Sequence, residues 1–150
     1  MKNKTNWHKD TISVRGGLKR SAFKETSEAL FLNSGYVYDT AEEAAEAFSG
    51  DIDRFVYSRF GNPTVAMLEE RLALMEGAEA ALATGTGMAS MFMSMAGMLS
   101  QGDRVVASRA LFGACYSVIR DILPRWGIEV AFVDGTDLNQ WTAALGKPAK

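Results

Sequence analysis

Cysteine and histidine are almost missing from this sequence, which has one of each among its 150 residues. A single cysteine, Cys115, cannot form an internal disulfide bond, and this is consistent with a reducing compartment. His8 and Cys115 lie far apart and lack the spacing of metal ligands, so we expect no metal centre. We interpret His8 as a solvent-exposed residue of the terminal segment.

Long apolar runs and an excess of positive charge are also missing. The N-terminal segment "MKNKTNWHKDTISVRGG" contains no apolar stretch of the kind found in secretion signals. The most apolar run, residues 87–99, is too short to span a bilayer and is interrupted by Ser94 and Gly97. A net charge of −2 and a pI of about 5.4 argue against nucleic acid or an anionic membrane as the main partner. We therefore expect a cytoplasmic protein.

The composition is otherwise that of a globular protein, with 47% hydrophobic and 23% charged residues. Residues 1–27 lack sustained periodicity, and residues 29–38 are extended and rich in aromatics. A short helix is predicted over 40–50, opened by a capping box at Thr40–Glu43 and ended by Gly50. The first third of the chain is therefore expected to be mostly an extended arm.

The pattern becomes regular from Asn62 onward. Asn62 can cap a helix whose first residue is Pro63, and Gly77 can end that helix. Three apolar residues at helical spacing are predicted to share its apolar face, turned away from the charged side chains: Leu68, Leu72 and Met75.

Strands and helices alternate after this first long helix. The predicted strands cover 79–84, 103–108 and 128–134, and the predicted helices cover 87–99, 112–127 and 137–145. This alternation is typical of a mostly parallel sheet with helices on both faces, so we predict an α/β fold. A parallel sheet of three strands is small and has bare edges, which indicates the first part of a larger domain. The many methionines of the helix at 87–99 are interpreted as core-filling residues.

The segment "ATGTGMAS" joins a predicted strand to a predicted helix. In parallel sheets, ligands bind beyond the carboxyl ends of the strands. Gly85 and Gly87 allow a tight turn and a close approach to a ligand, and the helix start offers free N–H groups to a phosphate. Thr84 and Thr86 add hydroxyl groups. The alternative is a connection that uses glycine for geometry alone.

A dinucleotide site is the competing interpretation of the same glycines. Ser90 stands where the dinucleotide fingerprint requires glycine, and the next predicted strand ends in Ser108-Arg109 without an acidic residue for a ribose. Arg109 could instead suit the phosphate of NADP. An NADP-binding dehydrogenase module therefore stays open as an alternative.

Three further residues are of types that bind a flat, phosphorylated molecule. Tyr57 and Arg59 stand two residues apart in "YSRFGNPT" and can bind an anion, although a surface ion pair is the simpler explanation. Phe112 follows a predicted strand and can stack on a planar ring, although it could also anchor its helix in the core. With the phosphate loop, these residues favour pyridoxal 5′-phosphate (PLP).

The stretches "YSRFGNPT", "TGTGMAS" and "SRALFG", in this order, resemble the Cys/Met-metabolism PLP-dependent enzymes over about residues 11–145. The resemblance implies a type I PLP-dependent transferase fold, as in aspartate aminotransferase, and a homotetramer of close dimers. It implies that residues 1–60 are an arm that contacts the dimer partner and that residues 61–150 begin the PLP-binding domain. The cofactor-binding residues that it implies are Tyr57 and Arg59 on the partner's phosphate, Thr86, Gly87 and Met88 on the phosphate of their own subunit, and Phe112 on the ring.

Within this family, "TAEEAAEAF", "ATGTGMAS", "ASRALFG" and "RWGIEVAFVDGTDLNQW" resemble the O-succinylhomoserine sulfhydrylase branch. That branch makes L-homocysteine from O-succinylhomoserine and sulfide in methionine biosynthesis. Phe112 stands where many γ-synthases and γ-lyases have tyrosine, and it has no hydroxyl for acid–base chemistry. Cystathionine γ-synthase and the methionine or cystathionine γ-lyases stay open as alternatives.

The family's Schiff-base lysine, its aspartate facing the pyridine nitrogen and its substrate-binding arginine are expected beyond Lys150. We therefore assign no catalytic residue in this sequence. The 150-residue chain alone is expected to be inactive, and a non-catalytic fragment is a further alternative.

Overall fold

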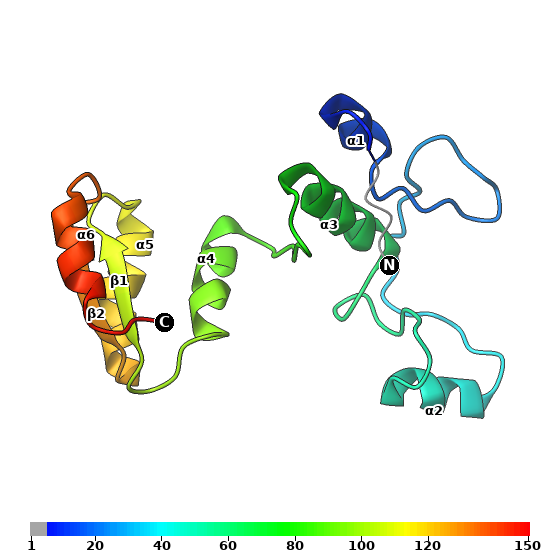
Figure 1. Ribbon diagram of the computed structural model, residues 1–150. Helices are drawn as coiled ribbons and strands as arrows, with labels where there is room; N and C mark the ends of the chain where they lie inside the picture. Colours follow the sequence, from blue (N-terminus) through cyan, green and yellow to red (C-terminus); the bar gives the residue numbers. More distant parts are fainter. Residues whose placement is uncertain (1–5) are drawn as a thin grey trace. The chain divides into compact units, whose positions relative to one another are not determined.

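The computed structural model describes residues 6–150, so the first five residues of the predicted arm lie outside the described part (Figure 1). The chain divides into two compact units, one ending at Ala83 and the other running from Thr84 to Lys150. The predicted boundary between an arm (residues 1–60) and the start of a larger domain (residues 61–150) applies to a longer protein and stays a prediction. Among residues 6–150, no helix has both the length and the apolarity that a membrane span requires.

The first unit begins with a short helix that the sequence pattern did not predict, α1 (Lys9–Arg15). His8 caps it, because its Nδ1 atom accepts a hydrogen bond from the Asp10 N–H at 3.4 Å. The His8 side chain is exposed, as predicted. Ile12 is the buried residue of α1, which packs against α3 (Pro63–Glu76). Two turns of helix are too short to show a periodic pattern, so the prediction of a plain arm was wrong here.

Helix α2 (Ala41–Ser49) has the predicted ends. The Thr40 hydroxyl accepts the Glu43 N–H at 3.0 Å, and the Glu43 carboxylate accepts the Asp39 N–H at 2.7 Å. Gly50 ends the helix with a φ of 86°, a conformation that other residues rarely adopt. The local capping residues were therefore sufficient to predict this element.

Helix α3 also has the predicted caps but a different buried face. The Asn62 side chain accepts the Thr64 N–H at 2.9 Å, and Gly77 ends the helix with a φ of 67°. The residues that the helix buries are Met67 and Ala73, whereas two of the three residues predicted to share its apolar face, Leu68 and Leu72, are 48% and 43% exposed.

The buried face of α3 is set by the segment that follows α1. A Cβ atom on Gly17 would lie 2.6 Å from the Met67 carbonyl oxygen, and the φ of Gly17 is +69°, so only glycine allows this close approach. The Arg71 Nε atom donates to the Gly16 carbonyl at 2.9 Å, and Arg71 forms an ion pair with Glu28. The arm therefore packs on the side of α3 that carries Arg71. The sequence pattern predicted that the charged side chains of this helix, Arg71 among them, would lie opposite its buried face.

The second unit is an α/β unit whose two strands pair in parallel. Its elements are α4 (Gly87–Ala96), β1 (Arg104–Ser108), α5 (Gly113–Ser117), a π-helical turn (Val118–Ile122), a 3-10 turn (Leu123–Trp126), β2 (Glu129–Val133) and α6 (Leu138–Leu145). The register pairs Arg104 with Glu129 and Ser108 with Val133. The irregular turns confirm that the third predicted helix is disturbed near Pro124.

The core of the second unit lies between the strands and the helical turns that connect them. Its buried cluster consists of Ala107, Ile119, Leu123 and Ile128. Met91 and Met95 of α4 pack against this cluster, which confirms the interpretation of these methionines as core residues. Met98 was expected on the same face but is 66% exposed, because α4 ends at Ala96.

The strand predicted at 79–84 is not formed. This segment has no ladder partner among the described residues, and the Ala83 N–H donates instead to the Glu69 carboxylate at 2.7 Å. A strand requires a neighbour to pair with, and the two strands of the described chain pair with each other. The sheet therefore has two strands where three were predicted.

Candidate cofactor site

The N-terminus of α4 presents unused N–H groups. The Thr86 hydroxyl accepts the Ala89 N–H at 3.0 Å, and the Thr86 carbonyl accepts the Ser90 N–H at 3.0 Å. The N–H groups of Gly87 and Met88 precede these bonds, and no hydrogen bond among the described residues uses them. The Thr86 hydroxyl proton is also free to donate. These donors and the helix dipole together suit a phosphate group.

The glycines of this loop leave open space rather than relieve backbone strain. A Cβ atom at Gly85 or Gly87 would meet no atom within 4 Å. Neither residue has a positive φ. The backbone of this turn therefore does not require glycine, contrary to the prediction. A ligand can approach the N–H donors of Gly87 and Met88 because no side chain at Gly85 or Gly87 stands in front of them.

Phe112 lies beside this loop and is 76% exposed. It immediately precedes α5, in the connection that leaves the carboxyl end of β1. The Cys115 thiol contacts the Met88 sulfur at 3.8 Å, which places the starts of α4 and α5 next to each other. The exposure of Phe112 contradicts the alternative of a core anchor and leaves its ring face available for stacking.

Tyr57 and Arg59 lie in the first unit, in the irregular segment before α3. An isolated bridge between Tyr57 and Gly35 fixes this segment. The Arg59 guanidinium carbon lies 5.0 Å from the centre of the Tyr57 ring and 5.2 Å from that of Phe60. Within residues 6–150, Arg59 has no carboxylate partner, so the surface ion pair offered as the simpler explanation is not formed. Both side chains are exposed and can meet an anion.

The structure therefore brings together four of the six predicted cofactor-binding residues. Thr86, Gly87, Met88 and Phe112 all belong to the second unit and surround the starts of α4 and α5. Tyr57 and Arg59 belong to the first unit. The donors, the open space and the exposed aromatic ring fit the phosphate and the flat ring of PLP.

A polar network that no sequence pattern predicted lies at the carboxyl edge of the two strands. The Gln140 side-chain oxygen accepts the Asp134 N–H at 2.9 Å and contacts the Arg109 guanidinium at 3.4 Å. Hydrogen bonds from the Thr136 N–H and hydroxyl hold the pKa of Asp134 below its usual range, and Arg109 contributes further. The network connects the segment leading to Phe112 with β2 and α6. Side chains this far apart in sequence show no local pattern.

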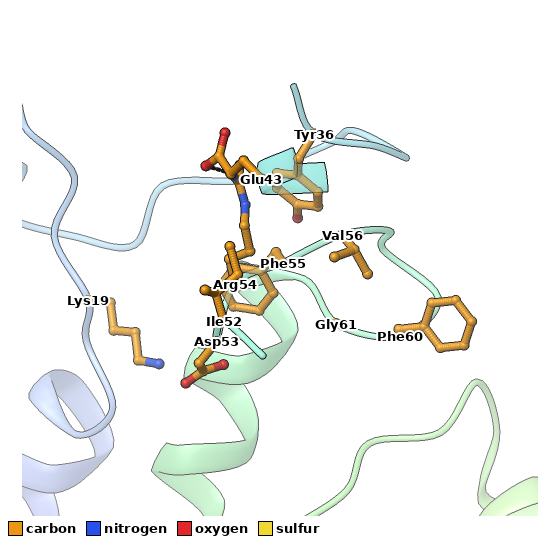
Figure 2. A pocket seen from close by; sticks show the side chains of 10 residues that line it. All are labelled: Lys19, Tyr36, Glu43, Ile52, Asp53, Arg54, Phe55, Val56, Phe60 and Gly61. Atoms are coloured by element: carbon orange, nitrogen blue, oxygen red, sulfur yellow. Dashed lines mark hydrogen bonds and ion pairs between the residues drawn. The ribbon is translucent and has the colours of Figure 1, made fainter. Parts of the chain in front are cut away.

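A second feature without an indication in the sequence is a pocket of about 830 Å³ in the first unit (Figure 2). Side chains from the arm, from α2 and from the segment before α3 line it. The Tyr36 hydroxyl is buried at this pocket and has no hydrogen-bond partner among the described residues.

Comparison with known proteins identifies relatives over nearly the whole chain. An O-succinylhomoserine sulfhydrylase from Mycobacterium tuberculosis is 56% identical over 93% of this chain and 34% of its own length. An O-succinylhomoserine sulfhydrylase from Pseudomonas aeruginosa is 44% identical over 90% of this chain and 34% of its own length. An L-methionine gamma-lyase from Porphyromonas gingivalis is 33% identical over 90% of this chain and 34% of its own length. The chain thus spans about a third of the length of the curated relatives it matches.

Solved structures agree with these relatives. A Campylobacter jejuni structure assigned as an O-acetylhomoserine (thiol)-lyase, with N′-pyridoxyl-lysine-5′-monophosphate, matches with a TM-score of 0.84 and 29% identity. The match covers 92% of this chain and 34% of that one. It confirms the predicted α/β fold class and PLP as the cofactor of the family.

A family model described as Cys/Met metabolism PLP-dependent enzyme matches residues 10–150. This match includes both units and all six predicted cofactor-binding residues. The family match excludes the alternative interpretation of the chain as an NADP-binding dehydrogenase module. The chain belongs to the Cys/Met-metabolism PLP-dependent enzyme family.

Proposed function

We propose that this chain is the N-terminal third of an O-succinylhomoserine sulfhydrylase that makes L-homocysteine from O-succinylhomoserine and sulfide. In this γ-replacement, succinate leaves the γ carbon of the substrate and sulfide takes its place. The observation that carries the proposal is the 56% identity to an O-succinylhomoserine sulfhydrylase over 93% of the chain. The parent protein is proposed to be a cytoplasmic homotetramer of close dimers.

The residues of this chain would hold the cofactor rather than carry out the covalent step. When bound, PLP supplies an electron sink that allows protons to leave the α and β carbons of an amino acid. The Gly87 and Met88 N–H groups and the Thr86 hydroxyl would donate to its phosphate, and Phe112 would stack on its ring. Tyr57 and Arg59 would bind the phosphate held by a partner subunit.

A γ-lyase or cystathionine γ-synthase is the second candidate, because an L-methionine gamma-lyase is 33% identical over 90% of this chain. The three reactions differ in the sulfur compound that is consumed or released. Assays of the full-length protein with O-succinylhomoserine and either sulfide or cysteine, and with methionine alone, separate these activities. Homocysteine formed from sulfide supports the sulfhydrylase. Cystathionine formed from cysteine, or methionine cleaved to a keto acid, would instead support the second candidate.

Replacement of Phe112 tests its proposed stacking role. We expect Phe112→Ala in the full-length protein to weaken PLP retention, because an aromatic stacking pair contributes about 0.5–1.5 kcal/mol beyond area burial. Phe112→Tyr keeps the flat ring and is expected to retain PLP nearly as the wild type does. Retention is measured by dialysis followed by the cofactor's absorbance. Wild-type retention by Phe112→Ala would contradict the stacking role.

The lysines of this chain provide a separate test. None of them stands in a sequence context like that of the family's Schiff-base lysine, so we expect no borohydride-stable PLP adduct at a unique lysine of the 150-residue chain. Mass spectrometry after borohydride treatment measures the adduct. A single stoichiometric adduct, with turnover of O-succinylhomoserine, would show that this chain contains its own covalent catalyst.

A further inference from the structure

We infer that Ser108 and Gly135 are positioning residues for Phe112, because together they hold the connection between β1 and α5 in the shape that presents its ring. The inference rests on the proposed stacking role of Phe112. Both residues lie at the carboxyl edge of the two strands, in the same compact unit as the donors of α4. Neither is proposed to contact the cofactor, so they would act through Phe112.

The Ser108 hydroxyl folds the start of this connection. Its oxygen accepts the Ala110 N–H at 3.0 Å, which closes a turn directly after β1. The Arg109 N–H donates to the Val133 carbonyl at 2.9 Å, so the backbone stays bonded to β2 for one residue beyond the strand. The first two N–H groups after β1 are thus both bonded, and this constrains the short connection that leads to Phe112.

Gly135 leaves the room that the Ser108 hydroxyl occupies. A Cβ atom on Gly135 would lie 2.5 Å from the Ser108 Oγ atom and 3.2 Å from its Cβ atom. The first distance is well inside van der Waals contact, so a side chain at position 135 would displace the hydroxyl from the Ala110 N–H. The φ of Gly135 is not positive, so glycine is required here for space rather than for backbone conformation.

The backbone around Gly135 is held in place by α6. The Gln140 side-chain oxygen accepts the Asp134 N–H at 2.9 Å, and the Trp141 Nε1 atom donates to the Gly135 carbonyl at 3.3 Å. The Asp134 carboxylate also accepts the Thr136 N–H at 2.9 Å, which closes a turn around Gly135. These bonds support the turn on both sides. A steric conflict at Gly135 would therefore be relieved on the β1 side rather than by movement of the turn.

The test measures the dissociation constant of PLP for the full-length apoprotein and the visible circular dichroism of the bound cofactor. Ser108→Ala removes the acceptor of the Ala110 N–H, and Gly135→Ala displaces it. Each variant is expected to weaken PLP binding about two- to tenfold, the range that the loss of one stacking contact allows. The circular dichroism band of the cofactor should change in both, because it depends on what packs against the ring.

Combined variants show whether the two residues act together and through Phe112. The Ser108→Ala/Gly135→Ala double variant has no hydroxyl to displace, so it should bind PLP nearly as Ser108→Ala does. Adding Gly135→Ala to Phe112→Ala should cause no further loss, because the ring to be positioned is absent. Losses that multiply in full in either combination would overturn the inference.

Two control variants separate positioning from a general effect on the second unit. Gly146→Ala replaces another glycine without a positive φ, and Ser117→Ala removes another exposed serine hydroxyl. Both should bind PLP as the wild type does, and equal losses in the controls would overturn the inference. Far-ultraviolet circular dichroism shows which variants are folded. If Gly135→Ala does not fold, Ser108→Ala, which adds no atoms, still decides the question.

The outcomes separate this inference from the proposals on which it rests. Wild-type PLP affinity and an unchanged circular dichroism band in Ser108→Ala, with a loss in Phe112→Ala, would overturn the inference and leave the stacking role intact. Wild-type affinity in Phe112→Ala would overturn the stacking role and this inference with it. Neither result depends on turnover of O-succinylhomoserine, so a failure of the proposed reaction is detected separately by the substrate assays.

Discussion

Replacing Arg59 by alanine in the full-length protein is expected to weaken PLP binding more than tenfold, which corresponds to about 1.4 kcal/mol. A guanidinium group offers two parallel hydrogen bonds to phosphate oxygens and stays charged at any working pH. Arg59 has no carboxylate partner within residues 6–150, so its charge is available for such a bond. The measurement is the dissociation constant for PLP, from titration of the apoprotein followed by absorbance or fluorescence.

Arg125→Ala is the matched control for this prediction. Arg125 is also an exposed arginine, but it lies in the 3-10 turn before β2 and no cofactor role is proposed for it. Its replacement should leave the dissociation constant unchanged. An equal loss of affinity in both variants would mean that net charge, rather than a bond from Arg59, determines PLP affinity.

Replacing Leu123 by alanine is expected to destabilise the second unit by about 2–5 kcal/mol. Leu123 has no exposed surface and belongs to the buried cluster with Ala107, Ile119 and Ile128. Truncation removes buried methyl groups and leaves a cavity between the strands and the helical turns. Urea unfolding of the 150-residue chain, followed by tryptophan fluorescence, measures the change in free energy, and Trp126 of the 3-10 turn that contains Leu123 contributes to this signal.

Leu145→Ala removes the same number of carbon atoms at a position that is 55% exposed. Its cost should be well below that of Leu123→Ala, because less apolar surface is lost and no enclosed cavity forms. If both variants lost the same free energy of unfolding, Leu123 would not be a core residue of a folded unit.

Local chemistry accounts for the elements that could be predicted from the sequence. Asn62 with Pro63, and Thr40 with Gly50, determine helix ends through bonds within a few residues, and both predicted helices formed. The unused donors at the start of α4 are also local, since the Thr86 cap and the helix start define them. Such features depend on neighbouring residues alone.

Contacts between distant residues account for what could not be predicted. The apolar residues of α3 occur on more than one face, and the docking of Gly17 decides which face is buried. The predicted strand at 79–84 would have needed a partner strand. The apolar pattern of a segment does not show whether such a partner is available. The contact of Met88 with Cys115 and the pocket around Tyr36 likewise join residues far apart in sequence.

We propose that Arg59 serves the cofactor of a neighbouring subunit, while the start of α4 serves the cofactor of its own. Arg59 and the α4 donors belong to different compact units of the chain, which is compatible with this division. The most direct measurement mixes full-length Arg59→Ala subunits with full-length subunits that lack the covalent lysine, each inactive alone. A shared site predicts that hybrid dimers, counted by native mass spectrometry, regain activity at one intact site. Hybrids that form but stay inactive would contradict the claim and assign Arg59 to its own subunit or to no site.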